Sequence, residues 1–256
     1  MRLLTRLSLW ALSLALVSFI ALAADWGYEG KTGPDFWGGL SEDFALCAAG
    51  KSQSPINIVD SVATRADLKD IEFHYDETAL TILNNGHTIE VEYDSGSYII
   101  LDGIRFDLVQ FHFHAPSEHM LNGHQFPMEM HLVHKSADGE LAVIGLLIQE
   151  GQENPAFKDI LENMPKEASE ESHVIARLNA DDLLPASRTT YRYSGSLTTP
   201  PCTEGVRWSF LTEAVELAKE QIQSYADVIR ESCCTFNNRP VQPLNGRELL
   251  LDLSED

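Results

Sequence analysis

Hydrophobic and polar residues alternate along much of the stretch from Ile71 to Ile148, and turn-forming residues interrupt the alternation at short intervals. Segments such as TALTIL, HTIEVEYD, SYIILDG, FDLVQFHFH, MEMHLVHK and ELAVIGLLI carry the pattern, and Asn-Asn-Gly, Ser-Gly and Asp-Gly lie between them. Successive side chains of a strand point to opposite faces, so this pattern predicts an antiparallel sheet with hairpin connections.

Helical periodicity is present in two places. Asn154 to Asn163 begins with a candidate N-cap asparagine, and Pro155 occupies the first helical position, which proline favours. Glu213 to Ile229 predicts an amphipathic helix with one apolar stripe. That stripe comprises Val215, Ala218, Ile222 and Tyr225. The proline-rich C-terminal segment NNRPVQPLNGRELL predicts an extended arm, and no repeat or long linker divides the chain. We therefore expect a single, mainly β domain with peripheral helices.

The N-terminus has the features of an export signal. Arg2 and Arg6 precede an apolar run of about 17 residues, which closes on Ala21-Leu22-Ala23. Such a basic start, apolar centre and small-residue ending predict a secretory signal peptide over residues 1–23 and a mature domain over residues 24–256. The alternative is a membrane anchor, but the run is short for a span and no later stretch is apolar enough. We expect a periplasmic or secreted protein without a membrane span.

The chain is strongly acidic, with a formal charge of −21. Removing residues 1–23 takes away two arginines and no acid, which makes the charge −23. Nucleic acid and anionic membranes would be repelled, so we exclude them as partners. The acidity suits a well-solvated surface, and the sequence leaves the oligomeric state open.

All four cysteines lie in the mature chain, and export to an oxidising compartment favours a disulfide. Four cysteines allow three full pairings. A bond between the neighbours Cys233 and Cys234 needs a strained ring, so we expect Cys47 to pair with Cys202. For Cys233 and Cys234, free thiols and an intersubunit bond both remain open.

Two short motifs bring histidines onto strand faces. In QFHFH, His112 and His114 are two residues apart and therefore point the same way, about 6–7 Å apart. In EMHLV, His131 occupies the corresponding place on a second strand. Gln110 and Glu129 each precede a histidine by two residues and can accept the second ring N–H.

Three imidazoles of this kind can hold zinc at about 2.0–2.1 Å each and leave one tetrahedral position open. An open position is typical of a catalytic zinc site rather than a structural one. A His-X-His pair alone is weak evidence, because most histidines on strands are structural, and Glu-X-His on a second strand makes the signal more specific.

Six longer motifs extend this pattern over the mature chain. They are SQSPINI (52–58), LNNGH (83–87), QFHFHAPSEH (110–119), EMHLVH (129–134), GSLTTPPC (195–202) and NNRPVQPLNGR (237–247). In these motifs the chain resembles an α-class carbonic anhydrase of the exported bacterial type. The resemblance implies a large, twisted, mostly antiparallel central sheet, and exported members have a cysteine pair that matches Cys47 and Cys202.

The resemblance also implies a reaction and its residues. A zinc ion (Zn²⁺) on His112, His114 and His131 is expected to hydrate carbon dioxide reversibly to bicarbonate and a proton, by attack of zinc-bound hydroxide. The implied catalytic residues are Thr198, which orients the hydroxide and donates to Glu118, and His87, which passes the proton to solvent. The remaining implied residues are Gln110 and Glu129 as partners of the ligand rings, Thr199 at the substrate, Tyr28 and Asn85 along the proton path, and Val133, Val143, Leu197, Val206 and Trp208 as an apolar wall for carbon dioxide.

Some residues depart from the family pattern or remain open. Thr88 and Glu90 differ from the residues often found after the proton-transferring histidine, and Glu90 could hold His87 by its charge. His119 could join the hydrogen bonds of Glu118. A non-catalytic binding module would lack a ligand histidine, whereas all three are present. A zinc esterase is the other alternative, because the same hydroxide attacks activated carbonyls.

Overall fold

The computed structural model describes residues 25–252, so the expected signal peptide over residues 1–23 lies outside the described part. The strands are β1 (Asn57–Ile58), β2 (Thr64–Ala66), β3 (Glu72–His74), β4 (Thr78–Asn84), β5 (Ile89–Glu92), β6 (Tyr98–Leu101), β7 (Ile104–His114), β8 (Met120–Leu121), β9 (His124–Gln125), β10 (Met128–Ser136), β11 (Leu141–Glu150), β12 (Glu171–Leu178), β13 (Thr190–Ser196), β14 (Glu204–Leu211), β15 (Val215–Leu217) and β16 (Leu250–Asp252). The α-helices are α1 (Trp37–Leu40), α2 (Leu46–Ala49), α3 (Lys158–Glu162) and α4 (Lys219–Ser232). Single 3₁₀ turns cover Gly30–Thr32, Glu42–Phe44, Asp60–Val62, Pro155–Phe157 and Ala180–Leu183.

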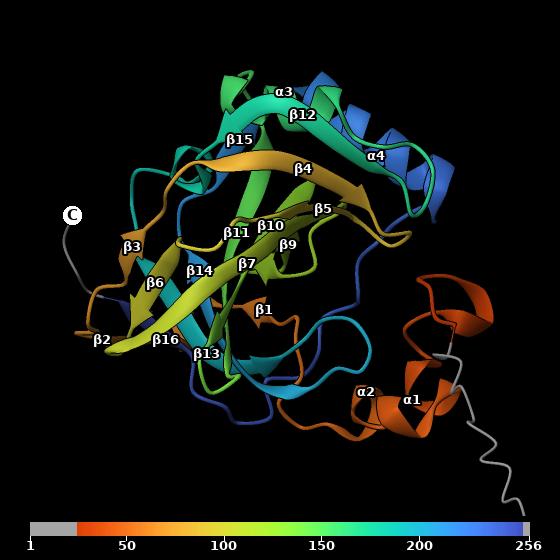
Figure 1. Ribbon diagram of the computed structural model, residues 1–256. Coiled ribbons are helices and arrows are strands. Elements are labelled where there is room, and N and C mark those ends of the chain that lie inside the picture. The colour runs from red at the N-terminus through yellow and green to blue at the C-terminus, as the bar shows by residue number, and fades with distance from the viewer. Residues whose placement is uncertain (1–24, 253–256) are drawn as a thin grey trace, which may run out of the picture.

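Thirteen strands form one large sheet through the centre of the molecule (Figure 1). Its main path runs β12, β4, β5, β7, β10, β11, β14, β13, β16 and β2, and a small separate sheet joins β1, β8 and β9. Neighbouring strands are mostly antiparallel, as the alternation predicted. In the large sheet, the exceptions are β11 with β14 and β15, and β16 with β2, which pair in parallel. The expected fold class, a single mainly β domain on a large central sheet, is confirmed.

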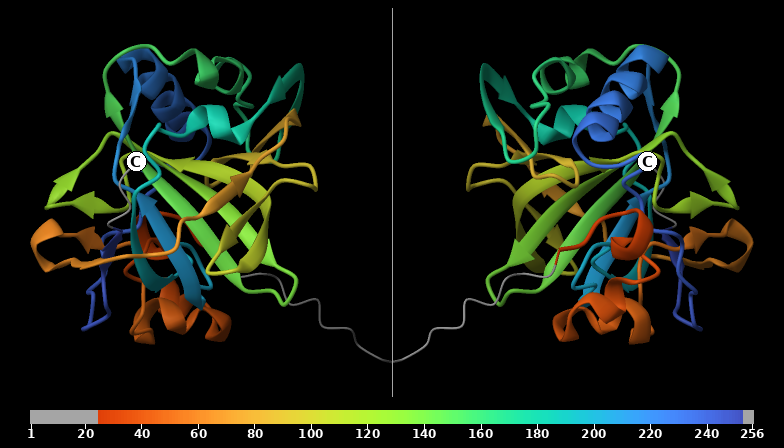
Figure 2. Two further views of the ribbon diagram at one scale, coloured as in Figure 1. Left: turned by 90° about the vertical axis from the view of Figure 1, so that its left-hand side faces the viewer. Right: turned by 90° about the vertical axis from the view of Figure 1, so that its right-hand side faces the viewer.

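The helices lie on opposite sides of the molecule. All three views place α3 and α4 beside β12 and β4, and α1 and α2 on the opposite side of the molecule (Figures 1 and 2). The chain after α4 has no helix or strand until Leu250. Among residues 25–252, no helix is both long and apolar enough to cross a membrane.

One helix prediction is confirmed and the other needs correction. The Asn154 side chain accepts a hydrogen bond from the Ala156 backbone N–H at 3.1 Å, and a 3₁₀ turn followed by α3 begins after it. The helix predicted from Glu213 instead begins at Lys219. Val215–Leu217 forms strand β15, because its alternating side chains and backbone pair in parallel with the end of β11.

The apolar sides of β7 and β10 explain how these strands hold their histidines. Phe111 and Phe113 on β7, and Met130 and Leu132 on β10, are at most 1% exposed and pack in the main core. Burying each of them contributes about 1.5–3 kcal/mol relative to leaving it in water. The alternate residues of both strands must therefore point to the opposite face of the sheet.

The four cysteines form two disulfides. Cys47 in α2 is bonded to Cys202 in the loop after β13, with their Cα atoms 5.1 Å apart, which confirms the predicted pair. Cys233 is bonded to Cys234, contrary to the free thiols or intersubunit bond expected. The backbone leaves the helical conformation at Cys233 (φ −137°, ψ −70°), and this turn brings the neighbouring thiols together.

Candidate active site

Three histidine rings converge on the face of the sheet opposite the phenylalanines of β7. His112 and His114 come from β7, and His131, on β10, is the register partner of His112. The ring centroids are 4.7–5.2 Å apart. One ring nitrogen from each residue lies within 4.8 Å of the other two, so the three rings can share one ion.

The outward-facing nitrogens of two rings are bound by the residues that precede them on the strand. Nδ1 of His112 donates to Oε1 of Gln110 at 2.9 Å, and Nε2 of His131 donates to Oε1 of Glu129 at 2.5 Å. Because a carboxylate and an amide oxygen only accept, each neutral ring keeps a lone pair on its other nitrogen. Those lone pairs are the ones available to a metal.

The third ring is held by a residue for which the sequence analysis assigned no role. Nδ1 of His114 donates to the backbone carbonyl of Asn237 at 2.7 Å. The Asn237 side chain is tied in turn to the Phe113 carbonyl at 3.0 Å and to the Ala115 N–H at 2.8 Å. The motif NNRP contains this asparagine, but nothing local in the sequence connects it with His114.

The donor set fits a metal ion. Nε2 of His114 is buried and has no hydrogen-bond partner among the described residues, as expected for an atom that serves as a ligand. Burial lowers the pKa of His112 well below its usual value, and the neighbouring rings of His114 and His131 lower it further. Burial also lowers the pKa of His131, so these rings stay neutral. Three imidazole nitrogens, with no fourth ligand grouped with them among the described residues, suit zinc in an open site.

Glu129 lies behind the metal position as a hydrogen-bond acceptor. Its oxygens accept from the rings of His131 and His119, and from the backbone N–H groups of Glu118 and His119, at 2.5–2.9 Å. Burial alone would raise the pKa of Glu129, but the two imidazoles lower it further than burial raises it. His119, which we expected to join the hydrogen bonds of Glu118, binds the carboxylate of Glu129 instead.

Glu118 has one occupied oxygen and one free oxygen. Oε1 accepts the backbone N–H of Arg239 at 2.8 Å. Oε2 is buried without a hydrogen-bond partner in the described part of the chain and lies 3.5 Å from Nε2 of His114. Thr198 is 5% exposed in the loop after β13, but no hydrogen bond joins its hydroxyl to Glu118 here. Arg239 had no predicted role, since it lies 121 residues from its partner.

A cavity of about 120 Å³ leads from two of the converging histidines toward His87. It is lined by Trp26, Tyr28, Asn85, His87, Thr88, Glu90, Gln110, His112, His114 and Thr199. The ring of His87 stacks on Trp26, with centroids 3.8 Å apart and planes 8° from parallel. Burial lowers the pKa of His87, and the charge of Asp25 opposes the shift.

The two residues that depart from the family pattern have different surroundings. The hydroxyl of Thr88 donates to the Phe113 carbonyl at 2.5 Å and so joins the core. Glu90 accepts from Nδ2 of Asn85 at 3.4 Å, and burial raises its pKa. The structure thus pairs Glu90 with Asn85 rather than with His87.

The five residues expected to form the apolar wall belong to one cluster. Val143, Val206 and Trp208 are at most 2% exposed, and Val133 and Leu197 pack against them. The Trp208 ring lies 4.8 Å from the ring of His131, which places this cluster beside the metal position.

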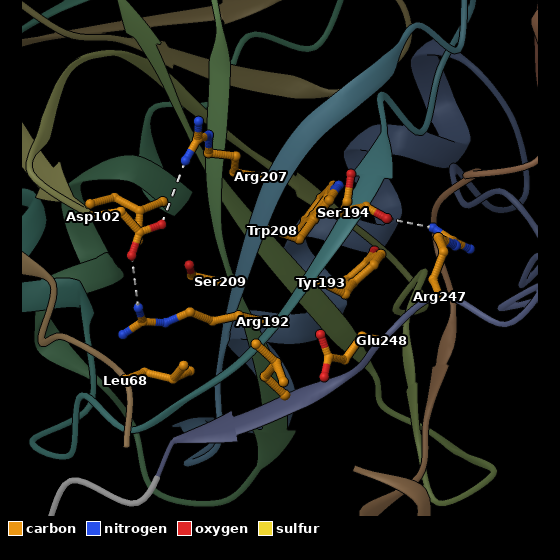
Figure 3. A pocket seen from close by; sticks show the side chains of 12 residues that line it. Leu68, Asp102, Arg192, Tyr193, Ser194, Arg207, Trp208, Ser209, Arg247 and Glu248 are labelled. Carbon is orange, nitrogen blue, oxygen red and sulfur yellow. Dashed lines mark hydrogen bonds and ion pairs between the residues drawn. The ribbon is translucent and has the colours of Figure 1, made fainter. Parts of the chain in front are cut away.

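A second, larger cavity of about 370 Å³ lies beside β13 and β14 (Figure 3). Arg192 and Arg207 both face the carboxylate of Asp102, at 3.9 and 3.5 Å, and Arg247 donates to the Ser194 carbonyl at 2.8 Å. The cavity's arginines are already paired within the protein, so we assign no chemistry to this cavity.

Comparison with known proteins agrees with this geometry. Residues 32–252 match the family model described as eukaryotic-type carbonic anhydrase. A carbonic anhydrase of Pectobacterium carotovorum is 45% identical over 245 residues, which cover 93% of this chain and 98% of that protein. The α-carbonic anhydrase of Thermovibrio ammonificans, solved with the inhibitor sulfanilamide, has a TM-score of 0.86 and 46% identity, covering 89% of this chain and 99% of that one. A hyperthermostable carbonic anhydrase from a hydrothermal vent chimney has a TM-score of 0.84 and 50% identity, covering 89% and 100%.

Proposed function

Because the chain belongs to the eukaryotic-type, or α, carbonic anhydrase family, we propose that it hydrates carbon dioxide reversibly to bicarbonate and a proton at a zinc ion held by His112, His114 and His131. One observation carries the proposal: three ring nitrogens lie within 4.8 Å of one another. Among residues 25–252, no fourth histidine, cysteine or carboxylate joins that group.

When bound, zinc with three neutral ligands lowers the pKa of a coordinated water to about 7, the known value for carbonic anhydrases, and so supplies hydroxide at neutral pH. The chain itself keeps the three histidine ligands uncharged and holds their rings in a fixed orientation. Gln110 and Glu129 fix the tautomers of two rings, and the Asn237 carbonyl fixes that of His114. Neutral imidazoles leave the positive charge of the ion undiminished, which an anionic ligand would reduce.

Glu118 and Thr198 are proposed to orient the nucleophile. The free Oε2 of Glu118 needs a donor, and Thr198 is buried in the loop after β13. If Thr198 donates to this carboxylate, its own lone pairs are left to accept a hydrogen bond from the nucleophile, which aims the nucleophile at the carbon of the substrate. The 3.5 Å distance from Oε2 to Nε2 of His114 supports a place for Glu118 at the edge of the reaction site.

The substrate is proposed to lie against the apolar cluster that contains Val143 and Trp208. Carbon dioxide carries no charge, so an apolar wall binds it without competing for its oxygens. Thr199 lines the adjoining cavity with His112 and His114, and we propose that it contacts substrate and product.

His87 is proposed to carry the proton away. Its ring lies in the cavity shared with Tyr28, Asn85 and two ligands, and a histidine can gain and lose a proton near neutral pH. Ordered water between Tyr28 and Asn85 would complete the path from the site to the ring. The stack on Trp26 positions the ring at the edge of the cavity.

The deciding experiment is stopped-flow hydration of carbon dioxide with and without a zinc chelator. We expect about one zinc per chain, rapid hydration, loss of the activity on chelation and recovery on adding zinc. His131→Ala should abolish both zinc binding and hydration, whereas the matched variant His124→Ala changes an exposed histidine outside the site and should keep both. A protein that contains zinc but turns over activated esters faster than carbon dioxide would be an esterase instead.

We also propose that residues 1–23 direct export to the periplasm or the medium. The Cys47–Cys202 disulfide supports an oxidising compartment. N-terminal sequencing of the protein recovered outside the cytoplasm should begin near Ala24, and recovery of the full chain would contradict the signal peptide.

A further inference from the structure

Cys233 and Cys234 form a disulfide at the end of α4, and the proposed reaction makes no use of them. The N–H groups of both residues donate to the Ile229 carbonyl, at 2.9 and 3.1 Å, so the pair closes the last turn of the helix. Cys234 is 7% exposed within the main core, whereas Cys233 is only half-buried. An attacking thiol can therefore approach the pair from the Cys233 side.

Stabilisation of the fold does not account for this bond. A disulfide restricts the unfolded chain more strongly when it closes a longer loop. Cys47 and Cys202 are 155 residues apart, whereas Cys233 and Cys234 are adjacent, so the second bond restricts the unfolded chain very little. Exposed disulfides are the labile or regulatory ones, and Cys233 is the more exposed partner of this pair.

The segment that follows the pair leads directly to the proposed metal site. Three residues beyond Cys234, the Asn237 carbonyl accepts the hydrogen bond from His114. Two residues further on, the Arg239 N–H donates to Glu118. The backbone of Thr235–Arg239 therefore positions one expected zinc ligand and the expected partner of Thr198.

The first two residues of this segment, Thr235 and Phe236, are exposed on its outer side. A cavity of about 280 Å³ separates it from residues 28–36, and Phe36 and Phe236, which line the cavity, are 53% and 57% exposed. The Thr235 N–H donates to Oε1 of Glu29 at 2.7 Å across this gap. Asn237 and Arg239 are themselves buried and hydrogen-bonded, so a change of backbone conformation at Cys233 and Cys234 would reach their backbone groups through Thr235 and Phe236.

We propose that Cys233–Cys234 is a reversible redox modification site, opened by a dithiol reductant, through which the Thr235–Arg239 segment adjusts the metal site. One reductant thiolate attacks Sγ of Cys233, forming a mixed disulfide and releasing Cys234 as a thiolate that takes up a proton. The second thiol of the reductant then attacks the reductant sulfur of the mixed disulfide. This step releases Cys233 as a thiolate, which also takes up a proton. The protein gains two electrons and two protons, and the dithiol becomes a disulfide.

The modification is tested on the folded, zinc-supplemented protein with dithiothreitol, followed by alkylation and peptide mapping. We expect two alkylated cysteines per chain, Cys233 and Cys234, while the Cys47–Cys202 peptide remains intact. Hydrogen–deuterium exchange of residues 235–239 should accelerate in the reduced protein. Thiols that become reactive only after unfolding, or exchange that does not change, would overturn the proposal.

The effect on the site rests on the proposed function and is measured separately. Deleting an outer partner of a metal ligand commonly costs 10–100-fold in activity or affinity, and loosening it should cost less, about 2–10-fold in carbon dioxide hydration. Reoxidation should restore the rate. Cys233→Ser/Cys234→Ser should have the reduced rate and no response to reductant. Ser232→Ala removes a hydrogen bond to Val228 in the same turn and should still respond.

A response of the double serine variant, or an unchanged rate in the reduced wild-type protein, would contradict regulation of the site. A protein that never hydrates carbon dioxide would refute the proposed function only, because the thiol count and the exchange of residues 235–239 do not depend on turnover. If the double variant fails to fold, the comparison of oxidised and reduced wild-type protein still decides the question.

Discussion

The backbone carbonyl of Asn237 accepts a hydrogen bond from Nδ1 of His114 at 2.7 Å, across 123 residues of sequence. The Asn237 side chain makes this contact possible, because its Nδ2 donates to the carbonyls of Phe113 and His87 and to the Tyr225 hydroxyl, at 3.0–3.1 Å. A fully buried amide thus ties the C-terminal arm to the strand that carries two ligands.

Replacing Asn237 by alanine should therefore affect stability and metal binding together. The substitution leaves the Ala115 N–H without its side-chain acceptor and the His87 carbonyl without its side-chain donor, which costs about 1–3 kcal/mol for each group that water cannot reach. We expect a lower free energy of unfolding in urea and a zinc affinity about tenfold weaker, since His114 loses its fixed orientation.

Asn238→Ala is the matched control for this variant. Asn238 is next in the chain, is only partly buried, and makes a single 3.4 Å hydrogen bond to the Ser117 carbonyl. If Asn238→Ala lowers the free energy of unfolding and the zinc affinity as much as Asn237→Ala does, the arm contributes to the site only through packing.

Short-range patterns predicted the strands and brought out the histidines, because alternation depends only on neighbouring residues. His112 and His114 share a face for that reason, and so do Gln110 and His112. Asn237 and Arg239 could not be found in this way: each acts through a backbone group, and a backbone group leaves no mark in the residue type.

The error at the start of α4 has a similar origin. Val215, Ala218 and Ile222 fit a helical stripe, but Val215 and Leu217 also fit an alternating strand. The parallel pairing of β15 with Ile148–Glu150 favours the strand over the helix. The paired residues are 67 positions apart in sequence, so a local pattern cannot show this contact. The sequence also disfavours a bond between Cys233 and Cys234, because neighbouring cysteines need a strained ring. The turn that permits the bond depends on where the helix ends, which the local sequence does not show.

His87→Ala should slow turnover in weak buffer by about tenfold or more, because a positioned proton-transfer group commonly contributes 10²–10⁴-fold. Added imidazole should restore much of the rate. His124→Ala alters an exposed histidine away from the cavity and should behave as wild type. An unchanged weak-buffer rate in His87→Ala would remove the proposed role.

The stack of His87 on Trp26 gives a separate prediction for pH. Burial lowers the pKa of His87, so its ring remains neutral, and able to accept a proton, below the usual histidine range. Trp26→Ala exposes the ring, which should move its pKa upward, and the acid limb of weak-buffer turnover should move to higher pH with it. A limb that stays in place would mean that His87 does not set it. The control is Trp37→Phe, since the Trp37 ring contacts Trp26, with centroids 5.3 Å apart, and is not stacked on His87.

Removing the long-range disulfide should cost far more stability than removing the short one. Cys47→Ser/Cys202→Ser removes a bond between residues 155 apart in sequence, for which chain entropy predicts a loss of up to about 5 kcal/mol. Cys233→Ser/Cys234→Ser should lower the free energy of unfolding much less. Urea denaturation of the two double variants at pH 7 tests the comparison, and similar losses would contradict the entropic argument.

Buried His134 should make the protein sensitive to mild acid. It is 0% exposed on β10, its Nε2 lies 2.8 Å from the Tyr75 hydroxyl, and burial lowers its pKa to about 3. In the unfolded chain a histidine takes up a proton near pH 6.5, so between about pH 6.5 and 3 the unfolded state binds a proton that the folded state does not. The free energy of unfolding should therefore fall as pH falls, by about 1.4 kcal/mol for each pH unit from this residue alone.

The test of His134 compares urea denaturation at pH 7 and pH 5.5 in wild type, His134→Gln and His124→Gln. Glutamine cannot take up a proton, so His134→Gln should lose less stability between the two pH values than wild type does, even if it is less stable at both. His124 is exposed, so His124→Gln should keep the wild-type difference. If His134→Gln also keeps it, the acid sensitivity comes from other groups, of which the buried rings of His112 and His131 are the first to examine.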